Sequence, residues 1–358
     1  MKPITIIAEA GVNHNGDEKL AFDLVDAAAE AGADIVKFQT FKAKELVTQS
    51  AQKAEYQKNN TNNGETQFSM LQKLELPYEM HFKLLEHCVK KGIEFLSTAF
   101  DLSSLEFLTN KLGLKKLKIP SGEITNAPLV LAHARTGCDL ILSTGMATLA
   151  EIEAILGVVA FGYITKADES PNITAFQKAY ASVEGQRALK EKVTLLHCTT
   201  EYPAPLEEIN LASMNTMTSA FGLTVGYSDH SEGITVPVAA AARGATLIEK
   251  HFTLDKTMEG PDHKASLEPN ELKNMIQAIR DVEKIIGNGI KGPQLSEVKN
   301  KEIARKSLVS LKTIEEGDIF TVNNLGVKRP GSGINPFQYW DILGQQSHCD
   351  YKKDELIK

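Results

Sequence analysis

The sequence predicts an α/β fold, a (β/α)₈ TIM barrel followed by a small C-terminal β-rich domain. Eight short runs rich in β-branched residues alternate with amphipathic helical stretches, and such alternation is typical of a parallel sheet. Eight strands in about 250 residues is the count and size of a closed barrel. An open doubly wound sheet is the alternative, but the phosphate-cradling GxGxxG motif is absent after the first run.

The elements can be placed one after another along the chain. The expected strands are residues 4–11, 33–40, 92–100, 115–122, 139–145, 192–199, 223–230 and 246–253. Stretches between them, such as EKLAFDLVDAAAEAGA and EMHFKLLEHCVKKG, have helical periodicity, and several end at glycine, as helix C-termini often do.

Two of the connections are long. Residues 42–77 contain the polar stretch KAEYQKNNTNNGETQ, which predicts a loop or lid over the barrel mouth. Residues 157–191 precede the sixth expected strand, a position at the barrel face opposite the active site. We interpret them as an insertion whose role the sequence leaves open.

The pattern changes after about residue 285, where the Gly- and Lys-rich run IIGNGIKGPQLSEVKNKE begins. We expect a catalytic barrel domain at residues 1–285, a linker at 286–300 and a small domain at 301–358. A domain of about 55 residues is marginal for independent stability, so we expect it to dock on another surface.

The composition excludes several classes of protein. The 358-residue chain is 42% hydrophobic and 24% charged, as in ordinary globular enzymes. Its formal charge of −7 argues against nucleic acid or an anionic membrane as partner. No apolar run approaches the roughly 18–20 residues that span a bilayer. The four cysteines form no paired motif, so we expect free thiols in a reducing cytoplasm.

Polar residues follow the expected strands at their carboxyl ends, where barrels of this kind carry their chemistry. They are Glu9, Lys37, Gln39, Thr98, Lys118, Ser121, Glu123, Ser143, Thr199, Tyr202, Ser228, His230, Glu249 and His251. Side chains alternate between the two faces of a strand, so Ser228 shares a face with His230, and Glu249 with His251.

The two strand-end histidines, His230 and His251, predict a metal site. A single histidine at such a place is more often a hydrogen-bonded structural residue. Two on neighbouring strands, with no cysteine and a carboxylate nearby, suit a divalent ion that keeps open positions for substrate. His81 and His87 lie on an expected helix instead, and we expect them at the surface.

The lysines Lys37 and Lys118 would be costly to bury without partners. Together with the neighbouring hydroxyls they predict a site for a phosphorylated carboxylic acid. Salt bridges to Glu9, Glu123 or Glu249 are the structural alternative, and a Schiff base on one lysine is the mechanistic alternative. Glu9 is a candidate general acid or base if burial raises its pKa, or else a simple partner of Lys37.

Nine stretches of the sequence together resemble the sialic acid synthase family, which condenses phosphoenolpyruvate with an N-acylated sugar aldehyde. They are AEAGVNHNGD, DIVKFQTFKA, FLSTAFD, KIPSGEITN, LILSTGMA, LLHCTTEYPAP, GYSDHSEG, EKHFTLDKTMEGPDHKASLEP and VKRPGSG. The tail is similar to the antifreeze-like (SAF) domain of these synthases. The resemblance implies a domain-swapped homodimer in which that domain covers the partner's barrel mouth.

The resemblance also implies roles for individual residues. Those implied to bind phosphoenolpyruvate are Lys37, Thr98, Lys118, Ser121, Ser143 and Ser228. Those implied to bind the sugar are Gln39, Glu123, Tyr202 and Asp262, with Arg329 reaching the sugar of the other subunit. His230 and His251 would bind Mn²⁺ or Mg²⁺, and Glu9 would be the acid/base residue.

Within this family, FKAKELVTQSAQKAEYQ, QFSMLQKLELP and HCTTEYPAP are most similar to legionaminic acid synthases. That resemblance implies 2,4-diacetamido-2,4,6-trideoxymannose as acceptor and N,N'-diacetyllegionaminic acid as product. Synthesis of N-acetylneuraminate from N-acetylmannosamine is the alternative, and pseudaminate synthesis a more distant one. A non-catalytic carbohydrate- or ice-binding protein is the alternative of another class, suggested only by the antifreeze-like tail.

Overall fold

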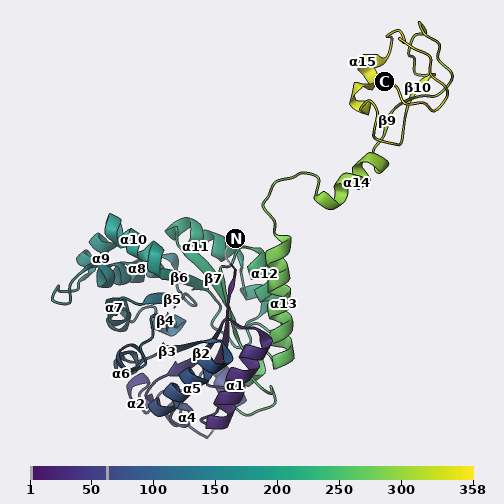
Figure 1. Ribbon diagram of the computed structural model, residues 1–358. Helices are drawn as coiled ribbons and strands as arrows, with labels where there is room; N and C mark the ends of the chain where they lie inside the picture. The colour runs from purple at the N-terminus through teal and green to yellow at the C-terminus, as the bar shows by residue number, and fades with distance from the viewer. Residues whose placement is uncertain (1–2, 62–63) are drawn as a thin grey trace. The chain divides into compact units, whose positions relative to one another are not determined.

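The computed structural model describes residues 3–61 and 64–358, and the chain divides into two compact units, Met1–Gly287 and Asn288–Lys358. The first unit is built on a closed barrel of eight parallel strands in sequence order (Figure 1). The strands are β1 (Thr5–Gly11), β2 (Ile35–Thr40), β3 (Glu94–Ala99), β4 (Lys116–Ile119), β5 (Asp139–Ser143), β6 (Val193–His197), β7 (Thr224–Asp229) and β8 (Leu247–His251). The predicted (β/α)₈ barrel is therefore confirmed.

Helices surround the barrel. They include α1 (Glu18–Ala31), α5 (Tyr78–Lys91), α6 (Leu102–Glu106), α7 (Ala127–Arg135), α8 (Leu149–Ile164), α11 (Ala212–Phe221), α12 (Thr235–Ala242) and α13 (Pro269–Ile285). Helix α1 shows how the sequence sets their ends: Asp17 caps its first turn by accepting from the Leu20 amide at 2.9 Å. At the other end Gly32 takes a left-handed φ of 88°, which most other residues avoid.

The pleat of the strands sorts the barrel interior into two layers. Apolar side chains fill the layer nearer the strand starts, as a cluster of Ile7, Ile35, Leu96, Ile141, Leu196 and Leu247. Two residues further along the strands the same face carries Glu9, Lys37, Thr98, Ser143 and Glu249. The apolar layer closes the barrel beneath the polar one, so ligands can reach the polar layer only through the mouth.

The long connection at residues 42–77 is partly helical. It contains α2 (Ala43–Leu46), α3 (Glu55–Asn60) and α4 (Gln67–Leu74), and α2 packs against α4. Its first and last turns are joined, because the Ala43 amide donates to Glu75 at 2.7 Å. The expected loop or lid is therefore interrupted by short helices, since a polar composition also suits short, half-buried helices.

The other long connection, residues 157–191, consists of the rest of α8 and two added helices, α9 (Ile173–Ala181) and α10 (Val183–Lys192). Both added helices pack against α8, where the Phe161 and Phe176 rings lie 5.3 Å apart. Residues 157–164 are thus a regular part of the helix after β5, and the insertion proper begins only after that helix.

The second unit has its own small core. It contains α14 (Leu295–Ala304), the antiparallel strands β9 (Ser307–Ser310) and β10 (Leu325–Lys328), and α15 (Tyr339–Ile342). Its buried cluster consists of Leu308, Ile314, Phe320, Leu325, Tyr351 and Ile357. Residues 295–300, part of the expected linker, form the first turns of α14. Among the described residues, no helix combines the length and apolar character needed to span a membrane.

One histidine on the barrel does not lie where the sequence suggested. His81 on α5 is fully buried, not at the surface. Its ring bonds the Thr40 hydroxyl at 2.7 Å and the Pro77 carbonyl at 3.0 Å, so it is a structural residue. His87 is partly exposed and lies 2.6 Å from Asp26.

Candidate active site

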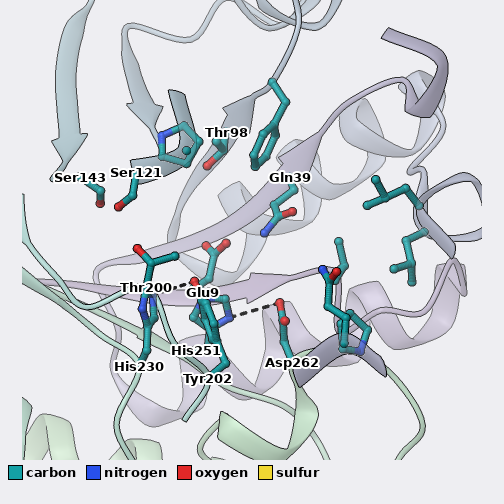
Figure 2. A pocket seen from close by; sticks show the side chains of 18 of the residues that line it. Glu9, Gln39, Thr98, Ser121, Ser143, Thr200, Tyr202, His230, His251 and Asp262 are labelled. Atoms are coloured by element: carbon teal, nitrogen blue, oxygen red, sulfur yellow. Dashed lines mark hydrogen bonds and ion pairs between the residues drawn. The ribbon is translucent and has the colours of Figure 1, made fainter. Parts of the chain in front are cut away.

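A cavity of about 370 Å³ opens at the carboxyl ends of the barrel strands. Its lining includes every barrel residue to which the family resemblance gives a role, namely Glu9, Lys37, Gln39, Thr98, Lys118, Ser121, Glu123, Ser143, Tyr202, Ser228, His230, His251 and Asp262. Thr199, another strand-end candidate, lines a different pocket. Figure 2 shows Thr98, Ser121 and Ser143 on one side and His230, His251, Tyr202 and Asp262 on the other. Arg329 lies in the second unit, exposed, and donates from Nε to the Ala304 carbonyl at 3.0 Å.

Two lysines and two glutamates form a buried ionic cluster on the cavity floor. Lys37 Nζ lies 2.7 Å from Glu9 and 3.4 Å from Glu249, while Lys118 Nζ lies 3.2 Å from Glu249. Both lysines are therefore salt-bridged, which was the structural alternative for them. They still line the cavity, so the pairing leaves them accessible to a bound anion.

The two glutamates of this cluster differ in acidity. Burial raises the pKa of Glu9 to about 7, against the opposing charge of Lys37. Burial would raise the pKa of Glu249 as well, but the charges of Lys118 and Lys37 outweigh burial and hold that pKa well below the usual range. Glu249 also accepts a hydrogen bond from Ser228 at 2.8 Å. Glu249 is thus a fixed anion, whereas Glu9 can gain or lose a proton near neutral pH.

The lysines differ in the same way. Burial lowers the pKa of Lys118, because Glu249 compensates it only in part. Burial also tends to lower the pKa of Lys37, but the charges of Glu249 and Glu9 together raise that pKa above its ordinary value. An arriving anion would therefore gain most from Lys118, whose positive charge is the less compensated of the two.

The two predicted metal-binding histidines face each other. The His230 and His251 ring centroids are 5.5 Å apart, and each residue is only 6% exposed. His230 Nδ1 lies 2.6 Å from the Thr199 carbonyl, which can only accept, so Nδ1 carries the proton and Nε2 keeps its lone pair. Burial lowers the pKa of His230 to about 4 and the pKa of His251 well below its usual value. Both rings are neutral imidazoles at pH 7.

The surroundings of His251 fit a divalent cation. Its Nδ1 is buried and, among the described residues, has no hydrogen-bond partner; Asp262 Oδ2 lies 3.8 Å away. In His230, Nδ1 donates to the Thr199 carbonyl, and a hydrogen bond from the nitrogen that does not bind the ion is usual for metal-binding histidines. Within residues 3–61 and 64–358, no cluster of three or more His, Cys, Asp or Glu residues forms a complete metal site. A cation held here would depend on substrate and water for its remaining ligands.

The opposite side of the cavity carries hydroxyl and amide donors. In the described part of the chain Ser143 Oγ is buried with no partner, and Ser121 Oγ accepts from the Gly145 amide at 3.0 Å. A Cβ at Gly145 would lie 2.2 Å from Thr200 Oγ1, so only glycine allows this close approach. Hydroxyls beside a partly compensated lysine form a suitable site for phosphate or carboxylate oxygens.

The sequence interpretation missed parts of the site. The sequence placed Glu249 among the strand-end polar residues, on the face of His251, and as a possible salt-bridge partner of the lysines, but it gave Glu249 no role toward a substrate. Tyr56 also lines the cavity, with its ring 5.0 Å from that of Tyr202. It belongs to the segment interpreted as a loop, where no sequence signal pointed inward.

Comparisons with known proteins agree with this geometry. The chain is 51% identical, over the full length of both chains, to N,N'-diacetyllegionaminic acid synthase of Campylobacter jejuni. It is 46% identical to the synthase of the same name from Legionella pneumophila, covering 95% of this chain and 89% of that one.

A solved structure of N-acetylneuraminic acid synthetase from Leptospira borgpetersenii, in complex with citrate, superposes with a TM-score of 0.66 at 34% identity. That match covers 84% of this chain and 90% of the other. A model of the NeuB family matches residues 24–291, most of the barrel unit and the predicted site residues within it. The chain therefore belongs to the NeuB family, the sialic acid synthase family that its motifs resemble.

Proposed function

We propose that this protein condenses phosphoenolpyruvate with 2,4-diacetamido-2,4,6-trideoxymannose and water to give N,N'-diacetyllegionaminic acid and phosphate. The observation that carries the proposal is the 51% identity over the whole of both chains to a synthase named for that product. The cavity supports it, because it combines cationic and hydroxyl groups for an anion with neutral imidazoles and a carboxyl group that titrates near pH 7.

Phosphoenolpyruvate would occupy the side of the cavity that carries the donors. Lys118 and Lys37 supply positive charge, and the hydroxyls of Thr98, Ser121, Ser143 and Ser228 supply hydrogen bonds to phosphate and carboxylate oxygens. Because burial disfavours the charged form of Lys118, a bound phosphate would stabilise that form as a second anion beside Glu249.

The proposal includes a divalent cation, Mn²⁺ or Mg²⁺, held by His230 and His251. Both imidazoles are neutral, so each keeps a lone pair at pH 7. The lone pair of His230 Nε2 accepts from the Tyr202 hydroxyl at 3.0 Å, a hydrogen bond that a bound cation would replace. When bound, such an ion would act as a Lewis acid toward the carbonyl oxygen of the sugar aldehyde. Asp262, Tyr202, Gln39 and Glu123 line the same cavity and would orient the sugar.

Glu9 would handle the proton of the attacking water. Carbon 3 of the enol forms a bond to the aldehyde carbon, whose oxygen becomes a hydroxyl group. Water then adds to carbon 2 and gives one proton to the Glu9 carboxylate, which passes it on to the sugar alkoxide; the second proton of the water leaves with the phosphate as the 2-keto group forms. A pKa of about 7 lets Glu9 take that proton and release it again in the same turnover.

We also propose a homodimer in the cytoplasm, in which Arg329 reaches the acceptor sugar of the partner subunit. The support is the small size of the second unit's core and the exposure of Arg329. Four free cysteines, Cys88, Cys138, Cys198 and Cys349, among the described residues are consistent with a reducing compartment.

Synthesis of N-acetylneuraminate from N-acetylmannosamine is the second candidate function. It is favoured by the 34% identity and shared fold with the Leptospira borgpetersenii synthetase. The lower identity of that match places it after the first candidate.

A substrate panel tests the proposal. Purified protein is mixed with MnCl₂, phosphoenolpyruvate and one sugar at a time, and phosphate release is followed. The mass of each product is measured by mass spectrometry. We expect the fastest release with 2,4-diacetamido-2,4,6-trideoxymannose, its loss in EDTA and its return with added Mn²⁺. Faster turnover of N-acetylmannosamine would establish the second candidate instead.

Phosphate release distinguishes the proposed synthase from a binding protein, and borohydride trapping distinguishes it from an enzyme that works through a Schiff base. A carbohydrate-binding protein would release no phosphate with any sugar. A Schiff-base enzyme would be trapped by borohydride as a lysine adduct, whereas we expect no adduct.

A further inference from the structure

The cavity has a second, apolar side that the proposed chemistry does not use. It is lined by Leu46, Val47, Met70, Leu71, Leu74 and Phe100, and we refer to this set as the apolar wall. Five of the six come from α2, α4 and the residue after α2, which lie outside the strands of the barrel. The wall is therefore supplied by the connecting segment and not by the residues that bind phosphate or metal in the proposal.

The apolar wall is firmly supported from behind. Met70 and Leu74 are buried with Val12 and Phe41 in a separate small core, against which Leu46, Leu71 and Phe100 pack. The Lys42 amide donates to Asp101 at 2.9 Å and fixes the start of the segment to the residues after β3. Further along, Asn60 donates to the Pro261 carbonyl at 3.0 Å. A supported wall of this kind keeps its shape when a ligand packs on it.

The front of the wall remains partly uncovered. Leu46, Val47 and Leu71 are only half-buried, and all three border the cavity. Apolar side chains that face a cavity gain by contact with an apolar part of a ligand, whereas a hydroxyl group placed there loses its water without a new partner. The wall therefore distinguishes a methyl group from a hydroxyl or hydroxymethyl group.

We propose that Leu46, Val47 and Leu71 select the acceptor sugar by receiving a methyl group that N-acetylmannosamine lacks. This inference rests on the proposed function. In the diacetamido sugar two such groups exist, the methyl at carbon 6 and the acetyl methyl at carbon 4. In N-acetylmannosamine a hydroxyl group stands at each of these carbons. A methylene-sized difference in an apolar pocket changes specificity by about 10- to 200-fold, so we expect selection of that size.

The test compares kcat/KM for three sugars with Mn²⁺ and saturating phosphoenolpyruvate. The sugars are 2,4-diacetamido-2,4,6-trideoxymannose, N-acetylmannosamine and 6-deoxy-N-acetylmannosamine. The variants are Val47→Thr, which replaces one methyl by a hydroxyl without changing volume, and Leu71→Gln. The matched control is Val89→Thr, at a position on α5 that is 74% exposed and outside the cavity lining.

We expect Val47→Thr and Leu71→Gln to lower the preference for the diacetamido sugar over N-acetylmannosamine by about tenfold or more. The control should keep the wild-type preference. If the variants lower kcat/KM for the 6-deoxy sugar relative to that for N-acetylmannosamine, the wall holds the methyl at carbon 6. If they lower kcat/KM for the diacetamido sugar relative to that for the 6-deoxy sugar, the wall holds the acetyl methyl at carbon 4.

Unchanged ratios in both folded variants would overturn the inference, and circular dichroism with thermal unfolding shows whether each variant is folded. This outcome differs from failure of the proposed function, in which wild-type protein would release no phosphate with any of the three sugars.

Discussion

The two faces of strands β7 and β8 carry similar residues in opposite states. Toward the helices, Asp229 and Lys250 are fully buried and paired at 2.5 Å. Asp229 also accepts from the Ser231 amide at 3.1 Å, and Lys250 donates to the Ser231 carbonyl. Toward the barrel interior, His230, Glu249 and His251 are also nearly buried, but they line a cavity.

The two faces differ in whether their buried polar groups all have hydrogen-bond partners. On the outer face Ser231 and the two charged residues supply one another with partners, which is the usual condition of a structural ion pair. On the inner face His251 Nδ1 has no hydrogen-bond partner within the described residues, and Glu9 in the same cavity has a pKa near 7. Incomplete satisfaction beside a cavity indicates a site that a ligand completes.

Removing an inner-face ligand should have the largest effect. We expect His251→Ala to lower kcat/KM by at least about 1000-fold, because the proposed cation would be lost and with it the electrophilic assistance to the aldehyde. Thermal unfolding should stay close to that of wild type, and phosphate release measures the activity. His87→Ala, which removes a partly exposed histidine on α5, is the control. Near-normal turnover by His251→Ala would refute its assigned role.

Removing an outer-face partner should affect stability instead. Lys250→Met leaves the Asp229 carboxylate buried without its cation, a change that costs about 3–5 kcal/mol. Lys116→Met is the control, because its ion pair with Glu94 at 2.9 Å is partly exposed and should contribute about 0–1 kcal/mol. Urea unfolding measures both, and equal losses in the two variants would contradict the contrast between the pairs.

The second unit extends the comparison beyond the barrel. We expect Arg329→Ala to raise the KM for the sugar by about tenfold, the size expected for one charged hydrogen bond. The KM for phosphoenolpyruvate should change much less, and Lys312→Ala, exposed in the same unit, serves as control. A larger change for phosphoenolpyruvate than for the sugar would rule out this role.

The pH dependence set by Glu9 is expected to be as small as the effect of Arg329→Ala. Because burial raises the pKa of Glu9 to about 7, its base form is lost as pH falls through neutrality. At pH 6 we expect kcat/KM to be about a tenth of its plateau value. The sign is diagnostic: a rate that rises on acidification from pH 7 to 6 would mean that Glu9 acts in its protonated form.

Much of the barrel could be predicted because buried parallel strands are short runs of branched apolar residues. The alternation of side chains along those runs also placed Ser228, His230 and His251 on the cavity face. His81 could not be placed in this way, because its burial depends on Thr40, a partner from a different element. The apolar wall was missed for a related reason, since its residues at 46–47 and 70–74 lie on either side of the polar stretch 53–67 and only tertiary packing brings them together.

Binding of Mn²⁺ to metal-free protein tests the central claim most directly. After treatment with EDTA, MnCl₂ is titrated into the protein while electron paramagnetic resonance follows the free ion. The account predicts one strong site per chain, lost in both His230→Ala and His251→Ala and kept in His87→Ala. Wild-type protein that binds no Mn²⁺, or variants that bind it as tightly as wild type, would contradict the account.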